Sequence, residues 1–189
     1  SVRDSAEFPG LDRARQTLVE DSLRGFRLAG VALPEPARTR FREIQNQLSK
    51  VQTEFEEAVL DATDAWTRPI LASELAGLSE SSRSTLAQAA RDKQHDGWLA
   101  TLKGPVVQAI LTFADDRALR ETIYTAYNTR ASDQGPHAHA HDNTARSVEI
   151  LALRHEAAQL LGFPSSADLS LVDKMAASPA RVLGFLRDV

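Results

Sequence analysis

An unbroken amphipathic stretch near the start of the chain constrains the fold most strongly. Between Ala37 and Arg68 there is no glycine and no proline, the two residues that most often end a helix. Apolar residues recur there at the three- or four-residue spacing of one helical face: Phe41, Ile44, Leu48, Val51, Phe55, Ala58, Ala62 and Trp66. The pattern predicts one long helix from about Pro36 to Arg68, with Leu48, Phe55 and Trp66 buried.

This long helix must pack against other parts of the chain. At about 1.5 Å per residue it would extend on the order of 50 Å, more than the diameter of a small domain. A coiled-coil partner would also explain the apolar face, but its aromatic and alanine positions suit a globular core better than a uniform Leu/Ile seam. We therefore expect packing within the chain.

The rest of the chain also predicts helices, so the expected fold class is mainly α. Helices are predicted over 11–28, around 86–90 behind a cap at Ser79 or Ser82, over 106–113 and 119–127, over 144–161, after Ser165 or Ser166, and from Ser178-Pro179 onward. A short strand is predicted near 98–102, between Gly97 and Gly104-Pro105. Its partner is expected outside the chain or in the neighbouring turn.

The helix predicted over 144–161 carries apolar residues on two faces. One face holds Ile150, Leu153, Ala157 and Leu160, and the other holds Val148, Leu151 and Ala158. This pattern predicts a helix buried on more than one side. His155 falls on the second face, where a partly buried, hydrogen-bonded histidine is expected.

The last predicted helix still has its apolar face running where the sequence stops. Val182, Phe185, Leu186 and Val189 follow helical spacing without a polar tail or a cap. We therefore expect residues 1–189 to be a single helical domain, a fragment of a longer protein truncated within the helix that starts near 179.

Composition excludes several classes of protein. The chain is 42% hydrophobic and 25% charged, which is typical of a globular domain. Its net charge of −4, with both signs interspersed, predicts no binding to nucleic acid or to an anionic membrane. No apolar run approaches the roughly 20 residues of a membrane span. Cysteine is absent, which fits a cytoplasmic location.

Three closely spaced histidines are the first candidate metal ligands. His137, His139 and His141 alternate with alanine in a segment rich in Ser, Asp, Gly and Pro. Three imidazoles this close could chelate zinc, nickel or copper if the loop folded around the ion. Metal sites usually take ligands from well-held, separated elements, so a solvated loop is the preferred interpretation.

Two other patterns resemble catalytic sites but are incomplete. His155-Glu156 looks like the start of an H-E-x-x-H zinc motif, but Gln159 stands where the second histidine would be. Carboxylates also gather along the long helix, which usually marks a solvated face: Glu54, Glu56, Glu57, Asp61 and Asp64. We predict no catalytic residue and no metal ligand within this chain, and its substrate-binding residues stay unassigned.

Several stretches, in order and correctly spaced over nearly the whole chain, together resemble the thimet oligopeptidase family of zinc metallopeptidases. The stretches are 48–55, 59–63, 75–78, 119–121 and 124–127, then the densest part at 129–136, 142–144, 150–156 and 159–163, and finally Lys174-Met175-Ala176. Each is weak alone, but their ordered sum is specific. The histidine run at 137–141 departs from the family pattern.

The resemblance implies the helical N-terminal lobe of a two-lobed clamshell peptidase that cleaves short peptides in a deep channel. It also implies that the zinc and its ligands lie outside this chain, so that the fragment itself is inactive. Its partners would then be short peptide substrates and the catalytic lobe of the same polypeptide. The alternative is a non-catalytic helical module that binds peptides or a partner protein without cutting them.

Overall fold

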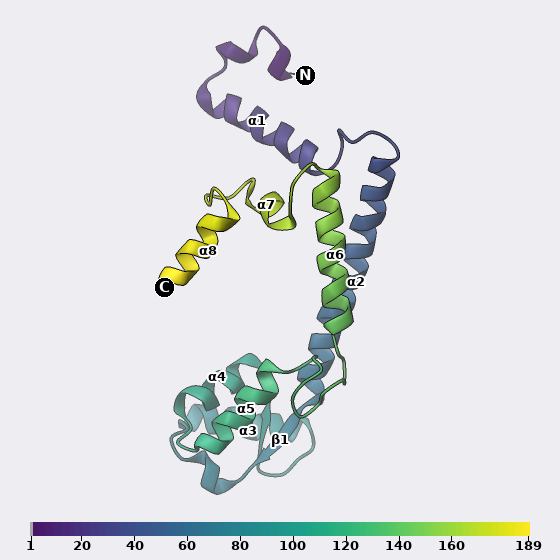
Figure 1. The fold of residues 1–189 in the computed structure, drawn as a ribbon. Coiled ribbons are helices and arrows are strands. Elements are labelled where there is room, and N and C mark those ends of the chain that lie inside the picture. The colour runs from purple at the N-terminus through teal and green to yellow at the C-terminus, as the bar shows by residue number, and fades with distance from the viewer. Residues whose placement is uncertain (1) are drawn as a thin grey trace. The chain divides into compact units, whose positions relative to one another are not determined.

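The fold consists of helices with one small sheet, in a computed structural model that describes residues 2–189 (Figure 1). Within this part, the helices and strands are α1 (Arg13–Leu28), α2 (Ala37–Ala65), β1 (Thr67–Ile70), α3 (Glu80–Asp92), β2 (Trp98–Thr101), α4 (Gly104–Phe113), α5 (Arg117–Asn128), α6 (Thr144–Leu160), α7 (Ser166–Leu171) and α8 (Pro179–Asp188). Short 3-10 turns occur at Val2–Asp4, Phe8–Gly10 and Ala72–Leu75. The predicted mainly α class is confirmed.

The described chain divides into two compact units. Unit 1 contains the residues up to Lys50 together with Glu149–Val189, and unit 2 contains Val51–Val148. Helices α2 and α6 therefore contribute to both units. That residues 1–189 form a single domain stays a prediction.

The predicted long helix is α2, and it ends earlier than expected. Its face carrying Ile44, Leu48 and Ala58 is buried, as is Trp66 just after it, whereas Phe55 is only partly buried. The predicted end at Arg68 was wrong, because Thr67 and Arg68 belong to β1. Arg68 precedes Pro69, and the proline ring disfavours helical backbone at the preceding residue.

Helices α2 and α6 lie side by side and antiparallel. In unit 1, Arg40 of α2 contacts Glu156 of α6, and Gln47 donates a hydrogen bond to Glu149 at 2.6 Å. In unit 2, Nδ2 of Asn143, the residue before α6, donates to the Phe55 carbonyl of α2 at 3.0 Å. Because residues further along α2 meet earlier residues of the α6 region, the two helices run in opposite directions.

Unit 2 has a closed hydrophobic core around a two-stranded antiparallel sheet. Strands β1 and β2 pair with Thr67 opposite Thr101 and Ile70 opposite Trp98. The predicted partner of the 98–102 strand was thus misplaced, because β1 lies within the chain and not in the neighbouring turn. The core side chains come from the strands, from α3 to α5 and from the residue after β2, and include Leu86, Leu102, Ile110, Leu119 and Ile123.

A glycine lets the backbone approach closely beside this core. Gly77 has a φ of +81°, and a Cβ built on it would lie 2.1 Å from the carbonyl oxygen of Phe113. Residues that carry a side chain rarely adopt such a φ, and no side chain would fit in that space. Gly77 therefore holds the segment before α3 against the end of α4.

Unit 1 contains three helices that bury little of their surface. Helices α1, α7 and α8 begin behind the caps Asp12, Ser165 and Ser178, whose side chains accept hydrogen bonds from backbone amides three residues on. This agrees with the predicted starts of the last two helices. Within the described residues, none of these three helices contains a buried side chain.

Helix α6 is buried on one face and only in part on the other. Ile150, Leu153 and Ala157 are buried, as predicted, and so is Ala158 of the second face, but Val148 and Leu151 of that face are exposed. The predicted burial of the second face is therefore confirmed at Ala158 and wrong at Val148 and Leu151. The spacing of apolar residues predicts a helical face that packs against other residues, and the described residues do not pack against Val148 and Leu151.

Candidate functional site

The three loop histidines do not converge on a common point. His137, His139 and His141 are all exposed, in a loop between α5 and α6. His139 Nδ1 lies 3.8 Å from Asp142 Oδ2, and His141 Nδ1 lies 3.9 Å from Asp61 Oδ2. Across residues 2–189, no three His, Asp or Glu side chains are grouped so that they could hold a metal ion. His139 and His141 instead lie beside separate carboxylates.

Asp142 helps to fix the end of this loop. Its Oδ1 accepts hydrogen bonds from the backbone amide and the hydroxyl of Thr144, at 2.8 and 2.7 Å. These bonds hold the pKa of the Asp142 carboxyl below its usual value, and His139 contributes less. The carboxylate therefore orders the start of α6.

Glu156 of the incomplete zinc motif forms an ion pair. Its two carboxylate oxygens accept hydrogen bonds from Nε and Nη2 of Arg40, at 2.7 and 2.8 Å. This bidentate contact lowers the pKa of Glu156 and raises that of Arg40. A carboxylate held in this way links α6 to α2 and is poorly suited to take a proton from water.

His155 lies on the solvent side of α6. It is exposed, so the expected partly buried histidine was wrong, for the same reason that Leu151 on this face is exposed. Gln159, one turn further along, is also exposed. These residues therefore supply neither a second metal ligand nor a free base.

The carboxylates of α2 lie mainly in solvent. Glu56, Glu57, Asp61 and Asp64 are exposed, while Glu54 is partly buried with its Oε2 3.7 Å from Nε of Arg146. The interpretation of a solvated face thus holds for four of the five side chains. They do not form a catalytic pair.

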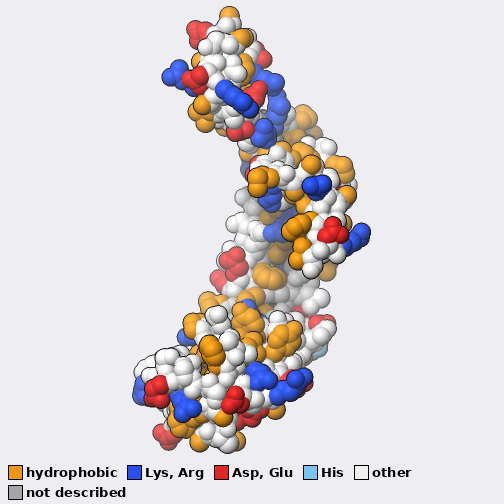
Figure 2. Space-filling view, turned by 90° about the vertical axis from the view of Figure 1, so that its left-hand side faces the viewer, with side chains coloured by type: hydrophobic (Ala, Val, Ile, Leu, Met, Phe, Trp, Pro, Cys, Tyr) orange, Lys and Arg blue, Asp and Glu red, His pale blue; other side chains and the backbone are white. Residues whose placement is uncertain are grey.

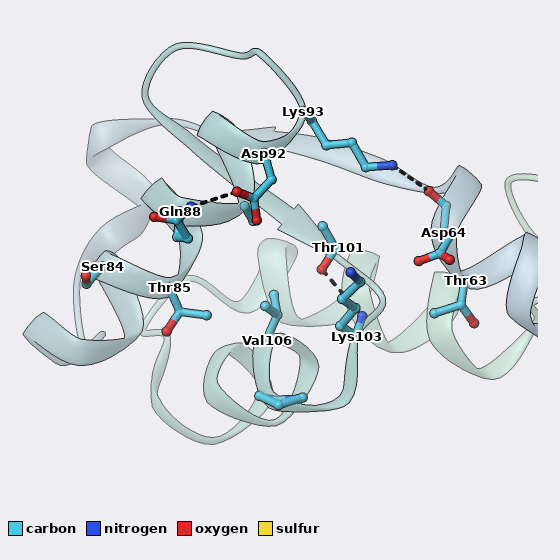
Figure 3. Close-up of a pocket in the computed structure, with 12 residues that line it drawn as sticks. Thr63, Asp64, Ser84, Thr85, Gln88, Asp92, Lys93, Thr101, Lys103 and Val106 are labelled. Carbon is cyan, nitrogen blue, oxygen red and sulfur yellow. Dashed lines mark hydrogen bonds between the residues drawn. The ribbon is translucent and has the colours of Figure 1, made fainter.

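A pocket of about 450 Å³ lies within unit 2 (Figure 3). Its walls come from the end of α2, one side of α3, the end of β2 and the start of α4, with Val106 and Ala89 among the apolar lining residues. Lys93 Nζ donates to the carbonyl oxygen of Asp64 at 3.4 Å, and Gln88 Nε2 donates to Asp92 at 2.6 Å. The volume suits a small molecule or an inserted side chain.

The chemistry of this pocket does not favour hydrolysis. Its lining includes Ser84, Thr85 and Thr101 but no histidine, so a hydroxyl nucleophile has no imidazole base there. Sequence patterns could not have found the pocket, because it forms only when the end of α2 packs beside α3, β2 and α4. Its ionisable lining residues are Asp64, Asp92, Lys93 and Lys103, so the pocket can hold a small polar ligand.

Comparison with known proteins gives the decisive observation. The family model described as Peptidase family M3 matches residues 110–189. Over all 189 residues the chain is 44% identical to oligopeptidase A of Salmonella typhimurium and to that of Escherichia coli. The chain is thus similar to peptidases of the M3 family. The whole of this chain is also 31% identical to the dipeptidyl carboxypeptidase of Escherichia coli, over 28% of the length of that protein.

The likeness to oligopeptidase A covers only the N-terminal part of that protein. The chain spans 28% of the length of each bacterial oligopeptidase A named above. The resemblance predicted from the sequence is confirmed, and the chain corresponds to a peptidase fragment. Its relatives extend well beyond the residues present here.

The residues described here do not fit the zinc ion that this family implies. Glu156 is paired with Arg40, Gln159 stands where an H-E-x-x-H motif would have its second histidine, and His139 and His141 lie beside separate carboxylates. A catalytic zinc site needs three fixed protein ligands and an open position. Within residues 2–189, no side chains are therefore assigned to the zinc.

Proposed function

We propose that this chain is the non-catalytic N-terminal portion of a zinc-dependent oligopeptidase that hydrolyses short peptides. The observation that carries the proposal is the 44% identity to oligopeptidase A over every residue of the chain. The zinc and its ligands would lie in the part of the parent protein outside this chain. The poor fit of His155, Glu156 and the histidine loop to a metal site supports the placement of the zinc ligands outside this chain.

Within the parent enzyme, we infer that the chain builds part of one wall of the peptide channel and supports the catalytic lobe. Helix α2 has 29 residues and is joined along its side to α6 by the Arg40–Glu156 and Gln47–Glu149 contacts. Such a cross-linked pair resists bending better than a lone helix. A stiff wall would keep the channel narrow, which favours short peptides over folded proteins.

We also propose a cytoplasmic location for the parent protein. The absence of cysteine supports it, because disulfides are common in secreted proteins. Within residues 2–189, no helix is both long and apolar enough to cross a membrane. Of two Arabidopsis thaliana relatives, one is named a probable cytosolic and the other an organellar oligopeptidase A.

The first experiment assays the chain by itself. Purified chain is incubated with a quenched fluorescent peptide and added zinc, beside a variant with His137, His139 and His141 changed to alanine. We expect no turnover by either protein, because three preorganised ligands and a positioned base are missing. Zinc-dependent turnover that the triple substitution abolishes would make the histidine loop an active site and overturn the proposal.

The second experiment supplies the missing part. A chimera is made in which this chain replaces the aligned 28% of Escherichia coli oligopeptidase A, and its peptide hydrolysis is measured with and without a chelator. We expect activity that chelation removes, while the bacterial protein without that segment has lost most of it. A folded chimera that binds peptides without cutting them would favour the alternative, a binding module.

A further inference from the structure

The C-terminal part of this chain exposes several large apolar side chains. Met175 between α7 and α8 is fully exposed at 105%, and Phe185 and Leu186 of α8 are exposed at 66% and 63%. Figure 2 looks onto these helices and shows hydrophobic side chains among charged ones on the face turned to the viewer. Single exposed apolar residues are ordinary, but a contiguous group of large ones marks a contact surface.

The spacing in α8 places these residues on one face. Val182, Phe185 and Leu186 lie three and four positions apart, so they share a side of the helix, whereas Arg187 projects from the other side. A hollow of about 580 Å³ lies against this helix and is lined by Met175, Val182 and Phe185. We define the α8 face as Met175, Val182, Phe185 and Leu186.

The length of the relatives indicates what covers the α8 face. The chain spans 28% of oligopeptidase A, and the match to the M3 peptidase family includes α7 and α8 as part of residues 110–189. Residues of the parent protein outside this chain are therefore available in the same polypeptide, at high effective concentration. A helix with no buried side chain gains little stability until such a cover is present.

We propose that the α8 face is an intramolecular docking surface for the part of the parent peptidase that lies outside this chain. The proposal rests on the proposed function, because it takes the parent to be an M3 peptidase. The occupant is an apolar surface with a cavity that receives Phe185 and Leu186. Arg181, Arg187 and Asp188 on the rest of α8 stay at the rim of this contact.

The lack of cysteine in the chain allows a direct footprint of this surface. Phe185→Cys and, as a matched control, Arg187→Cys are each placed in the isolated chain and in the chimera with Escherichia coli oligopeptidase A. Maleimide labelling at each position is followed by peptide mass spectrometry. In the isolated chain both thiols should react at similar rates.

In the chimera, we expect labelling at position 185 to slow by at least about tenfold, while labelling at 187 stays within about threefold, because a docked face opens only by local unfolding. Unchanged labelling at 185 would overturn the proposal. Protection at 185 in the isolated chain that grows with concentration would overturn it too, since a second copy would then be the occupant.

Peptide hydrolysis by the same chimera tests the proposed function separately. Activity without protection at 185 refutes docking alone. Protection without activity supports docking while refuting the proposed function.

A second measurement does not depend on the chimera. The isolated chain should bind the dye anilinonaphthalene sulfonate through the α8 face, and Phe185→Ser with Leu186→Ser should reduce the fluorescence several-fold relative to Arg187→Ser. Equal fluorescence of the two variants would show that the face is already covered in the chain alone, which contradicts the proposal.

Discussion

Helices α5 and α8 have similar amphipathic patterns but different surroundings. In unit 2, Leu119 and Ile123 of α5 are completely buried in a core built by neighbouring elements. In unit 1, Phe185 and Leu186 of α8 are exposed. An apolar helical face thus indicates that a cover is needed, but not whether this chain provides it. We infer that unit 2 is stable by itself and that α8 depends on the rest of its parent protein.

The largest expected effect is a cavity in the core of unit 2. Ile110→Ala removes a fully buried side chain and should lower the free energy of unfolding by about 2–5 kcal/mol. The two tryptophans, Trp66 and Trp98, both lie in unit 2, so denaturation followed by their fluorescence reports on this unit. Ile110→Val serves as control, with a loss of about 0.5–1.5 kcal/mol. Equal effects of the two variants would mean that this core is not closed.

A pair of glycines tests how tightly unit 2 is packed. Gly77 and Gly97 have nearly the same φ, +81° and +83°, but a Cβ meets Phe113 at the first and nothing within 4 Å at the second. Gly97→Ala should cost about 1–2 kcal/mol for the unfavourable backbone conformation. Gly77→Ala should cost at least about 1 kcal/mol more, because the backbone must also move. Equal unfolding free energies for the two variants would remove the argument for crowding at Gly77.

Next in size is a mostly buried ion pair in unit 2. Arg68 Nη2 donates to Glu74 Oε1 at 2.6 Å, and the backbone amide of Leu71 donates to Oε2 at 2.8 Å. Glu74→Gln leaves the Arg68 charge without its partner and should cost about 2 kcal/mol, below the 3–5 kcal/mol of a fully buried pair because Arg68 is partly exposed. Urea unfolding by tryptophan fluorescence measures the loss.

The same pair predicts a dependence on pH. The hydrogen bond from Arg68 is the main reason that the pKa of Glu74 is lowered in the folded protein. A lowered pKa means that this contribution is present above the unfolded value of about 4.3 and is lost as pH falls through the folded value. The free energy of unfolding of unit 2 should therefore fall below about pH 4.3. In Glu74→Gln, the plot of this free energy against pH should be flatter in the same range. An unchanged profile in the variant would assign the acid sensitivity to other carboxylates.

The ion pair of unit 1 should matter less. The contact between Arg40 and Glu156 is bidentate, but their side chains are 43% and 41% exposed. Water therefore screens the attraction between their charges. Glu156→Gln should cost less than about 1 kcal/mol. Thermal unfolding by circular dichroism, with Glu149→Gln as a control on the same helix, measures the cost. A loss as large as that of Glu74→Gln would show that unit 1 is more closely packed than the exposure indicates.

The smallest effect is expected on the α8 face. In the isolated chain, Phe185→Ala should change the free energy of unfolding by no more than about 0.5 kcal/mol, because the side chain has little contact to lose. Circular dichroism is the suitable probe, since neither tryptophan lies in unit 1. A loss comparable to that of Ile110→Ala would mean that α8 is buried in solution without any additional chain.

Local features of this structure could be predicted from the sequence, and contacts between distant segments could not. Ser79, Ser165 and Ser178 cap their helices, because a capping hydroxyl acts only on the next turn. The pairing of β1 with β2 was missed, since Pro69 and a run of only four residues give β1 a weak strand pattern.

The site illustrates the same limit. The sequence alone was enough to doubt a zinc site at His155, because Gln159 stands in place of a ligand. It could not reveal that Glu156 would meet Arg40, 116 positions away, or that four separate elements would enclose the pocket beside Val106. Such contacts depend on how helices pack, which residue spacing within one helix does not determine.

Hydrogen exchange of the isolated chain, read by mass spectrometry, tests the contrast between unit 2 and the C-terminal helices most directly. Amides within α4 and α5 should exchange only by global unfolding of unit 2, while those of α8 should exchange nearly as fast as an unfolded peptide. That pattern would support a self-sufficient unit 2 and a dependent α8. Protection of α8 equal to that of α5 in the isolated chain would contradict the account.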